Sequence, residues 1–153
     1  MILPILQYGN PILRKKGTLI SSVSKEHRKL AEDMLETMYQ AFGIGLAAQQ
    51  VGHTLQMTVI NITEVKDRPS KMWIDDKQVN PEDYMPLILL NPKIDTVKSK
   101  EKGFEGCLSF PGIEAEIARS KNIHVKALKL DGSNWEFEAA GLLSRVIQHE
   151  FDH

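Results

Sequence analysis

The segment "GLLSRVIQHEFDH", residues 141–153, carries the pattern that decides the fold. Its apolar residues recur at helical spacing, and they are Leu142, Leu143, Val146, Ile147 and Phe151. A helix with one apolar face of this width packs against other elements along that face. On the same helix His149 and His153 lie about 6 Å apart on one side, with Glu150 one residue round the axis. This HExxH spacing predicts a metal site with a carboxylate beside it.

Two imidazoles do not complete a catalytic metal site, which takes three protein ligands and one open position. The candidates for the third ligand are Cys107, His124, His53, His27 and a carboxylate. The three histidines occur in contexts typical of ordinary surface or strand residues. Cys107 lies in "GFEGCLSFPG", residues 103–112, where glycines let the backbone approach a site closely. A lone cysteine also occurs as a small buried apolar residue, so the residues alone leave the third ligand open.

The other predicted elements surround this segment in the sequence. Ser24 is a typical N-cap for a helix whose core stripe is Leu30, Ala31, Met34, Leu35, Met38 and Phe42, ending at Gly43. Strand-like runs follow at 55–60, 87–91, 123–130 and 134–139, the last two joined by a turn at 131–133. Residues 64–86 are charged and rich in proline, which predicts a long surface loop.

These elements predict the α+β class, in one domain over residues 1–153. A central HExxH helix is surrounded by antiparallel β-sheets, with a second long helix near the N-terminus. With 42% apolar and 25% charged residues, the composition is that of a soluble globular protein. The formal charge is −1 and no long basic run occurs, so we expect no DNA partner. There is no apolar run of about 20 residues and no signal-peptide pattern, which predicts no membrane partner and a cytoplasmic location.

The segment "FGIGLAAQQVG", residues 42–52, superficially matches the dinucleotide-binding pattern GxGxxA. That fingerprint must follow a strand and open a helix, whereas here a predicted helix precedes and a strand follows. The nucleotide interpretation is therefore rejected. What remains is a tight bend of small residues that ends in Gln49 and Gln50, whose amides either donate hydrogen bonds into a pocket or cap a turn.

Three segments in this order, "GIGLAAQQ" (43–50), "EGCLS" (105–109) and "QHEFDH" (148–153), resemble the signature motifs of the peptide deformylase family. The segment "YGNPILRKKG" (8–17) is also similar to the family's amino-terminal region, and residues 64–85 are the least family-like part. The resemblance implies a metal-dependent hydrolase. Its reaction is removal of the formyl group from the N-terminal formyl-methionine of newly synthesised polypeptides, with release of formate.

The resemblance also implies roles for individual residues. The metal ligands would be Cys107, His149 and His153, with Glu150 as general acid/base. The carbonyl oxygen would be held by Gln50 and the backbone N–H of Leu108. The methionine pocket would be lined by Ile44, Leu142 and Val146, with Glu105 near its mouth and the backbone of Gly45 and Gly106 pairing with the peptide as a strand. For Leu142 and Val146 plain core packing is an alternative.

One divalent metal ion per chain is expected. The ligand types admit zinc, iron, cobalt or nickel, and the resemblance favours Fe(II) with Zn(II) as the alternative. Two positions depart from the family: Glu114 stands where many bacterial relatives have an arginine, and the sequence stops at His153 where most relatives continue. The second departure predicts a short form with weak or no ribosome docking through a C-terminal helix. The expected partners are N-formyl-methionyl nascent peptides, and the expected state is a monomer.

Two other functions fit parts of the sequence. One is a general HExxH metallopeptidase, which would cleave internal peptide bonds in an extended cleft. The other is a metal-binding or peptide-binding module without turnover. Cleavage of unformylated internal peptides would favour the peptidase. The variant Glu150→Gln separates an enzyme from a binding module, because it removes a catalytic base without removing a metal ligand.

Overall fold

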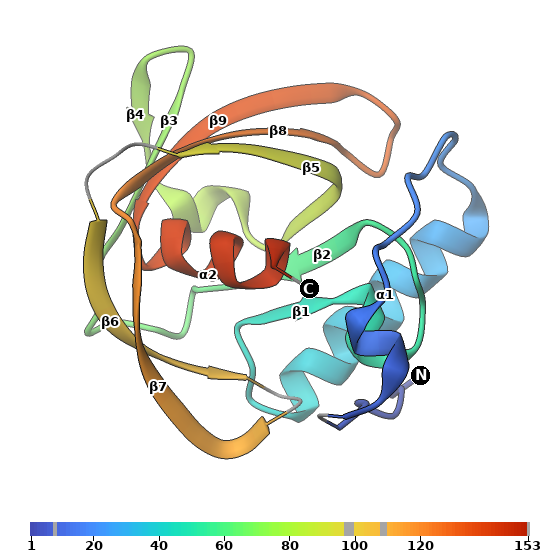
Figure 1. Cartoon of the computed structure of the whole chain (residues 1–153). Helices are drawn as coiled ribbons and strands as arrows, with labels where there is room; N and C mark the ends of the chain where they lie inside the picture. The colour runs from blue at the N-terminus through green and yellow to red at the C-terminus, as the bar shows by residue number, and fades with distance from the viewer. Residues whose placement is uncertain (8, 97–99, 108–109, 153) are drawn as a thin grey trace.

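Helix α2 (Leu142–Phe151) lies inside the molecule with strands around it (Figure 1). The structure, a computed structural model, describes residues 1–7, 9–96, 100–107 and 110–152, and only the backbone path over 100–107 and 110–118. Within these ranges seven strands form one antiparallel sheet in the order β1-β2-β5-β8-β9-β3-β4, and β6 pairs with β7 in a second. The strands are β1 (Gly45–Ala47), β2 (Met57–Ile60), β3 (Ser70–Ile74), β4 (Lys77–Val79), β5 (Leu87–Thr96), β6 (Lys100–Cys107), β7 (Phe110–Ser120), β8 (Asn122–Leu128) and β9 (Asn134–Gly141). The predicted α+β class with a central HExxH helix is confirmed.

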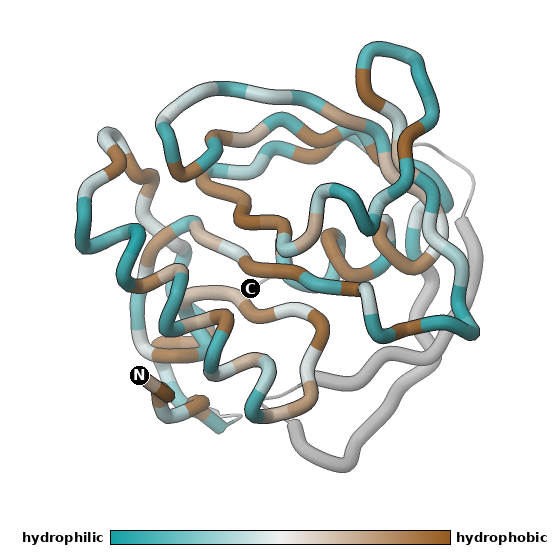
Figure 2. The backbone as a smooth tube through the Cα atoms, turned by 180° about the vertical axis from the view of Figure 1, so that it is seen from behind, coloured by the Kyte–Doolittle hydropathy of each residue, from teal (hydrophilic) through white to brown (hydrophobic). Residues whose placement is uncertain are grey.

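Two apolar clusters hold these elements together. The first packs the apolar face of α2 against the large sheet, and its largest fully buried members include Leu143, Phe137 and Met72. The second lies between the other helix, α1 (Lys25–Gln40), and strands β1 and β2. In Figure 2 hydrophilic and hydrophobic residues alternate along α1, as expected for a helix with one face on the core. Among the helices of the described ranges, none is long and apolar enough to cross a membrane.

Helix α1 begins as predicted but ends earlier. Ser24 caps it, since its side-chain oxygen accepts a hydrogen bond from the backbone N–H of His27. The predicted core stripe is buried at Leu30, Ala31, Met34 and Met38 and half-buried at Leu35. The prediction is wrong for Phe42, which is 95% exposed. The helix ends at Gln40, and Phe42 takes a left-handed φ of 58° that turns its side chain away from the buried face.

Residues 64–86 contain a β-hairpin, so the predicted plain surface loop is wrong. Strand β3 pairs with β9 on one side and with β4 on the other, and Met72 in β3 is completely buried. The turn between β3 and β4 is Asp75-Asp76, both at positive φ, which is the geometry that tight hairpins favour. The short 3₁₀ helix η3 (Pro81–Tyr84) follows. The prolines and the many charged residues of this segment are typical of loops. The hairpin has a single fully buried side chain, so its apolar pattern is weak.

The turn predicted between β8 and β9 is confirmed. Gly132 has a φ of 87°, and its N–H donates to the carbonyl oxygen of Lys129. The side chain of Asp131 accepts from the backbone N–H and the hydroxyl of Ser133. These local bonds close the hairpin and explain why the sequence signal was reliable there.

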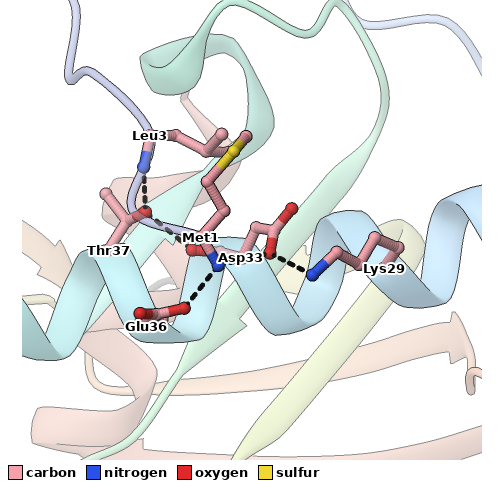
Figure 3. Close-up of polar contacts among 6 residues, drawn as sticks. All are labelled: Met1, Leu3, Lys29, Asp33, Glu36 and Thr37. Atoms are coloured by element: carbon pink, nitrogen blue, oxygen red, sulfur yellow. Dashed lines mark hydrogen bonds and ion pairs between the residues drawn. The ribbon is translucent and has the colours of Figure 1, made fainter.

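The amino-terminal segment is fastened to α1 by charge (Figure 3). The α-amino group of Met1 lies 2.9 Å from Oδ1 of Asp33 and 2.6 Å from Oε2 of Glu36. Lys29 approaches the same Asp33 oxygen at 3.0 Å. Hydrogen bonds from the Met1 ammonium and from Lys29 lower the pKa of Asp33 below its usual 3.8, and the bonds to Glu36 and Asp33 raise the pKa of the Met1 amine above 8.0.

The first prediction concerns the pH dependence of this contact. A lowered folded-state pKa means that the Asp33 contribution to stability is present above pH 3.8 and is lost as the pH falls through the lower folded value. The contribution of the Met1 α-amino group to stability is lost as the pH rises above 8.0 and through its raised folded-state pKa. Asp33→Asn should therefore lower the thermal midpoint at pH 7, and the difference from wild type should shrink in acid. Glu32→Gln is the control on an exposed position, and a difference that stays constant down to pH 3 would contradict the expectation.

Candidate active site

The first turn of α2 is fixed by residues from the β3 hairpin. Gly141, the N-cap, has φ 71° and ψ −141°, and a Cβ added there would lie 2.2 Å from the carbonyl oxygen of Pro69. That oxygen accepts from the N–H of Leu142 at 2.9 Å, and the hydroxyl oxygen of Ser70 accepts from the N–H of Leu143 at 2.9 Å. Two N–H groups that the helix cannot satisfy itself are thus bonded. Pro69 and Ser70, from the segment predicted as a surface loop, therefore position the start of the HExxH helix.

The last turns of α2 are tied to the end of β7. Nε2 of Gln148 donates to the carbonyl oxygen of Ser120 at 2.8 Å, and Oε1 of Gln148 accepts from the N–H of Ser120 at 3.0 Å. The hydroxyl of Ser144 donates to the same carbonyl at 3.1 Å. Arg119 forms an ion pair with Asp152, the C-cap residue. Gln148, Ser144 and Ser120 are buried, so this is a satisfied internal network next to the HExxH residues.

Sequence reasoning missed these positioning residues. Gln148 precedes His149 directly, but nothing in the sequence places its amide on a strand more than twenty residues away. The apolar face predicted for this helix included Phe151, and this part of the prediction is wrong because Phe151 is 47% exposed. The contacts in the structure come from Gln148 and Asp152 instead.

Glu150 points toward strand β1. It is 6% exposed, and a Cβ added at Gly45 would lie 3.0 Å from its Cγ and its Oε1 and 2.9 Å from Cγ1 of Val146. Only a glycine leaves space for both side chains at this approach. His149, half-buried on the same turn, has its Nε2 shielded from solvent, as has Oε2 of Glu150. The structure thus brings Gly45, Val146 and Glu150 of the predicted site together.

Gln50 lies in η2 (Ala48–Val51), the 3₁₀ helix that continues from β1. Its side chain is 1% exposed, and Oε1 accepts a hydrogen bond of 2.9 Å from the N–H of Ala47. Because the oxygen end of this amide is bonded to the strand, its NH₂ group is not the end that bonds to Ala47. Its backbone oxygen accepts from Leu6 at 2.7 Å, which fixes η2 to the amino-terminal segment.

The segment with Cys107 is described in its backbone alone. Cys107 ends β6, where the register with β7 shifts after Gly106, and Glu105 and Gly106 pair with β7 before it. The side chains of Glu105 and Cys107, and all of Leu108 and His153, lie outside the described residues. Among the side chains that the structure does describe, no group of three His, Cys, Asp or Glu is placed to hold a metal ion.

The predicted pocket residues fall in one place, and the other histidines fall elsewhere. Ile44, Leu142 and Val146 belong to the apolar cluster around α2, with Ile44 only partly buried. His27 takes part in the cap of α1, and His53 is exposed after η2. His124 in β8 pairs with Glu136 at 2.7 Å. The interpretation of these three histidines as ordinary surface or strand residues fits these contacts.

Comparison with known proteins agrees with this arrangement. A family profile described as polypeptide deformylase matches residues 2–153. Over 153 residues the chain is 50% identical to a peptide deformylase of Methylacidiphilum infernorum, covering 100% of this chain and 80% of that protein. The crystal structure of the peptide deformylase from Thermotoga maritima matches with a TM-score of 0.85 and 36% identity, covering 100% of this chain and 91% of that one. A peptide deformylase from Synechococcus elongatus in complex with actinonin matches with a TM-score of 0.83 and 36% identity, covering 99% and 72%.

These matches extend over nearly the whole chain, and the segments with the three sequence motifs lie within them. They confirm the predicted family, the fold class and the prediction of an enzyme that removes formyl groups from nascent polypeptides. The chain therefore belongs to the polypeptide deformylase family, a family of metal-dependent hydrolases.

Proposed function

We propose that Glu150 and Gln50 are the catalytic residues with which this chain hydrolyses the formyl amide of N-terminal formyl-methionine. The observation that carries this proposal is the approach of Glu150 to Gly45 at the edge strand β1. A peptide that pairs with the backbone of Gly45 brings its formyl amide next to that carboxylate. Glu150 is shielded from bulk water, which strengthens its interactions with a reacting group.

The proton movements follow from these positions. A carboxylate oxygen of Glu150 takes a proton from the attacking water as the water oxygen bonds to the formyl carbon. When the C–N bond breaks, the same carboxyl group gives that proton to the departing amine, and formate is released. The NH₂ group of Gln50, whose Oε1 is held by Ala47, donates to the oxyanion, together with the backbone N–H proposed at Leu108.

We propose Cys107, His149 and His153 as ligands of one divalent metal ion. A thiolate with two imidazoles suits Fe(II), Zn(II), Co(II) or Ni(II), and the shielded Nε2 of His149 fits a ligand atom. The bound metal supplies Lewis-acid activation of water near neutral pH. Fe(II) is the proposed ion and Zn(II) the alternative. Metal analysis of protein purified without oxygen, compared with its rate of formate release, distinguishes them.

The second prediction tests Gln50. Gln50→Glu keeps an acceptor for the N–H of Ala47 but removes the amide donors and adds negative charge, so kcat for formate release from formyl-Met-Ala-Ser should fall about 10²–10³-fold. The matched control is Gln49→Glu, because Gln49 is the neighbouring amide and is also buried. The assignment of Gln50 is wrong if both variants lose the same activity.

The remaining proposals concern the setting of the reaction. Formylated nascent polypeptides are the substrates, so the proposed location is the cytoplasm, where such chains are made. The methionine side chain is proposed to lie against Ile44, Leu142 and Val146, with Glu105 near the mouth of this pocket and the backbone of Gly106 pairing with the peptide. The monomeric state stays a prediction, which sedimentation would test.

A further inference from the structure

We infer that Phe42 contacts the third residue of the substrate, counting formyl-methionine as the first, and gives the enzyme a preference for apolar side chains there. This inference rests on the proposed function. Phe42 is the most exposed of the large apolar residues in the described part of the chain, at 95%. It lies three residues before Gly45, whose position beside Glu150 marks the reacting end of the substrate.

The conformation of Phe42 is one that glycine usually supplies. At the end of α1 the N–H of Gly43 donates to the carbonyl oxygen of Met38 at 2.9 Å, and Phe42 occupies the left-handed position of this helix cap at φ 58°. A bulky L-residue is uncommon in that conformation, where glycine has no steric penalty. The glycine of this sequence, Gly43, comes one position after the left-handed residue. The left-handed position itself is taken by Phe42, whose ring is exposed.

The loop that carries Phe42 is fastened to its surroundings. The hydroxyl oxygen of Tyr39 accepts from Nδ2 of Asn61 at 3.0 Å, and the N–H of Asn61 donates to the carbonyl oxygen of Ile44 at 2.9 Å. These bonds join the last turn of α1, the end of β2 and the residue before Gly45. Phe42 therefore lies on a loop whose two ends are held by hydrogen bonds, and the half-exposed Tyr39 is three residues before it.

Burial determines the direction in which a bound peptide leaves the site. Strand β1 lies at one edge of the large sheet, as the strand order and Figure 1 show. A peptide parallel to β1 would run toward Ala47 and η2, and every residue of that stretch is buried. An antiparallel peptide runs the other way, from Gly45 past Gly43 toward the exposed end at Phe42.

The lengths agree with a contact at the third substrate residue. The three residues from Phe42 to Gly45 span at most about 11 Å, and a bend at residues 41–44 shortens this distance. Each extended peptide residue advances about 3.3 Å. If the methionine lies opposite Gly45, the residue two positions later is the one that reaches the ring of Phe42, and an apolar side chain there would be covered by it.

The test compares kcat/KM for formyl-Met-Ala-Leu and formyl-Met-Ala-Ser. Wild type should prefer leucine, and in Phe42→Gly that preference should fall about tenfold, mainly through a higher KM for the leucine substrate. Phe42→Gly should also raise the thermal midpoint, because glycine suits the left-handed cap. Phe42→Tyr should retain the preference, and Leu19→Ala, on an exposed apolar residue outside the site, should leave it unchanged.

Three outcomes would overturn the inference. They are no leucine preference in wild type, an unchanged preference in Phe42→Gly, and an equal loss on both substrates in that variant. Absence of formate from wild type with either substrate would be a different failure, since it would reject the proposed function and the inference with it. Formate release without a Phe42-dependent preference leaves the proposed function standing and rejects only the contact.

Discussion

Glu150→Gln is expected to lower kcat for formate release about 10⁴-fold, the upper end of the range for a group that moves a proton. Glutamine has the same shape, so it fits the space beside Gly45 that Glu150 fills. It cannot take a proton from water at neutral pH, and both proton transfers of the proposed reaction use this one side chain. The proton steps are lost while the fold and the metal ligands remain.

The measurement is formate release from formyl-Met-Ala-Ser by protein prepared anaerobically with ferrous iron, with metal content determined on the same samples. Glu138→Gln, on the half-exposed side chain of another glutamate in β9, is the matched control and should keep full activity. Activity retained in Glu150→Gln would exclude Glu150 as the proton carrier. Loss of metal together with activity would instead assign Glu150 to holding the metal site.

Local patterns predicted those parts of the fold that local interactions determine. The cap at Ser24, the hairpin turn at Gly132 and the apolar face of α2 each arise from residues close in sequence. The three motifs predicted the family before any contact was known. They did so because each motif is a run of residues close in sequence, and the structure brings Gly45 of the first motif beside Glu150 of the third.

The parts that sequence could not predict depend on contacts between distant segments. Residues 64–86 gave a loop signal, yet Pro69 and Ser70 satisfy the first N–H groups of α2. The Gln148 side chain bonds to the backbone of Ser120, a contact that no periodicity reveals. Phe42 matched the helical period but lies beyond the end of the helix. Its left-handed φ turns the side chain away from the buried face. In each case the deciding partner is a backbone group or a turn, which apolar patterns do not detect.

Gly141→Ala is expected to be the most destabilising single methyl addition at a described glycine. The new Cβ would lie 2.2 Å from the carbonyl oxygen of Pro69, and φ 71° with ψ −141° is a conformation that other residues rarely adopt. Overpacking and backbone strain each cost about 1–3 kcal/mol, so the free energy of unfolding should fall by about 2–6 kcal/mol. For a chain of this size that corresponds to a thermal midpoint about 10 °C lower.

Gly132→Ala separates the two causes, because Gly132 also has a positive φ, of 87°, but an added Cβ meets nothing within 4 Å. Gly132→Ala should lower the free energy of unfolding by only about 1–2 kcal/mol, which is the cost of the backbone strain alone. Equal losses in the two variants would mean that the contact with Pro69 contributes nothing. If the difference is as large as expected, Gly141→Ala also displaces the carbonyl that holds the N–H of Leu142. Formate release by the folded fraction should then fall as well, since the start of the helix that carries His149 and Glu150 has moved.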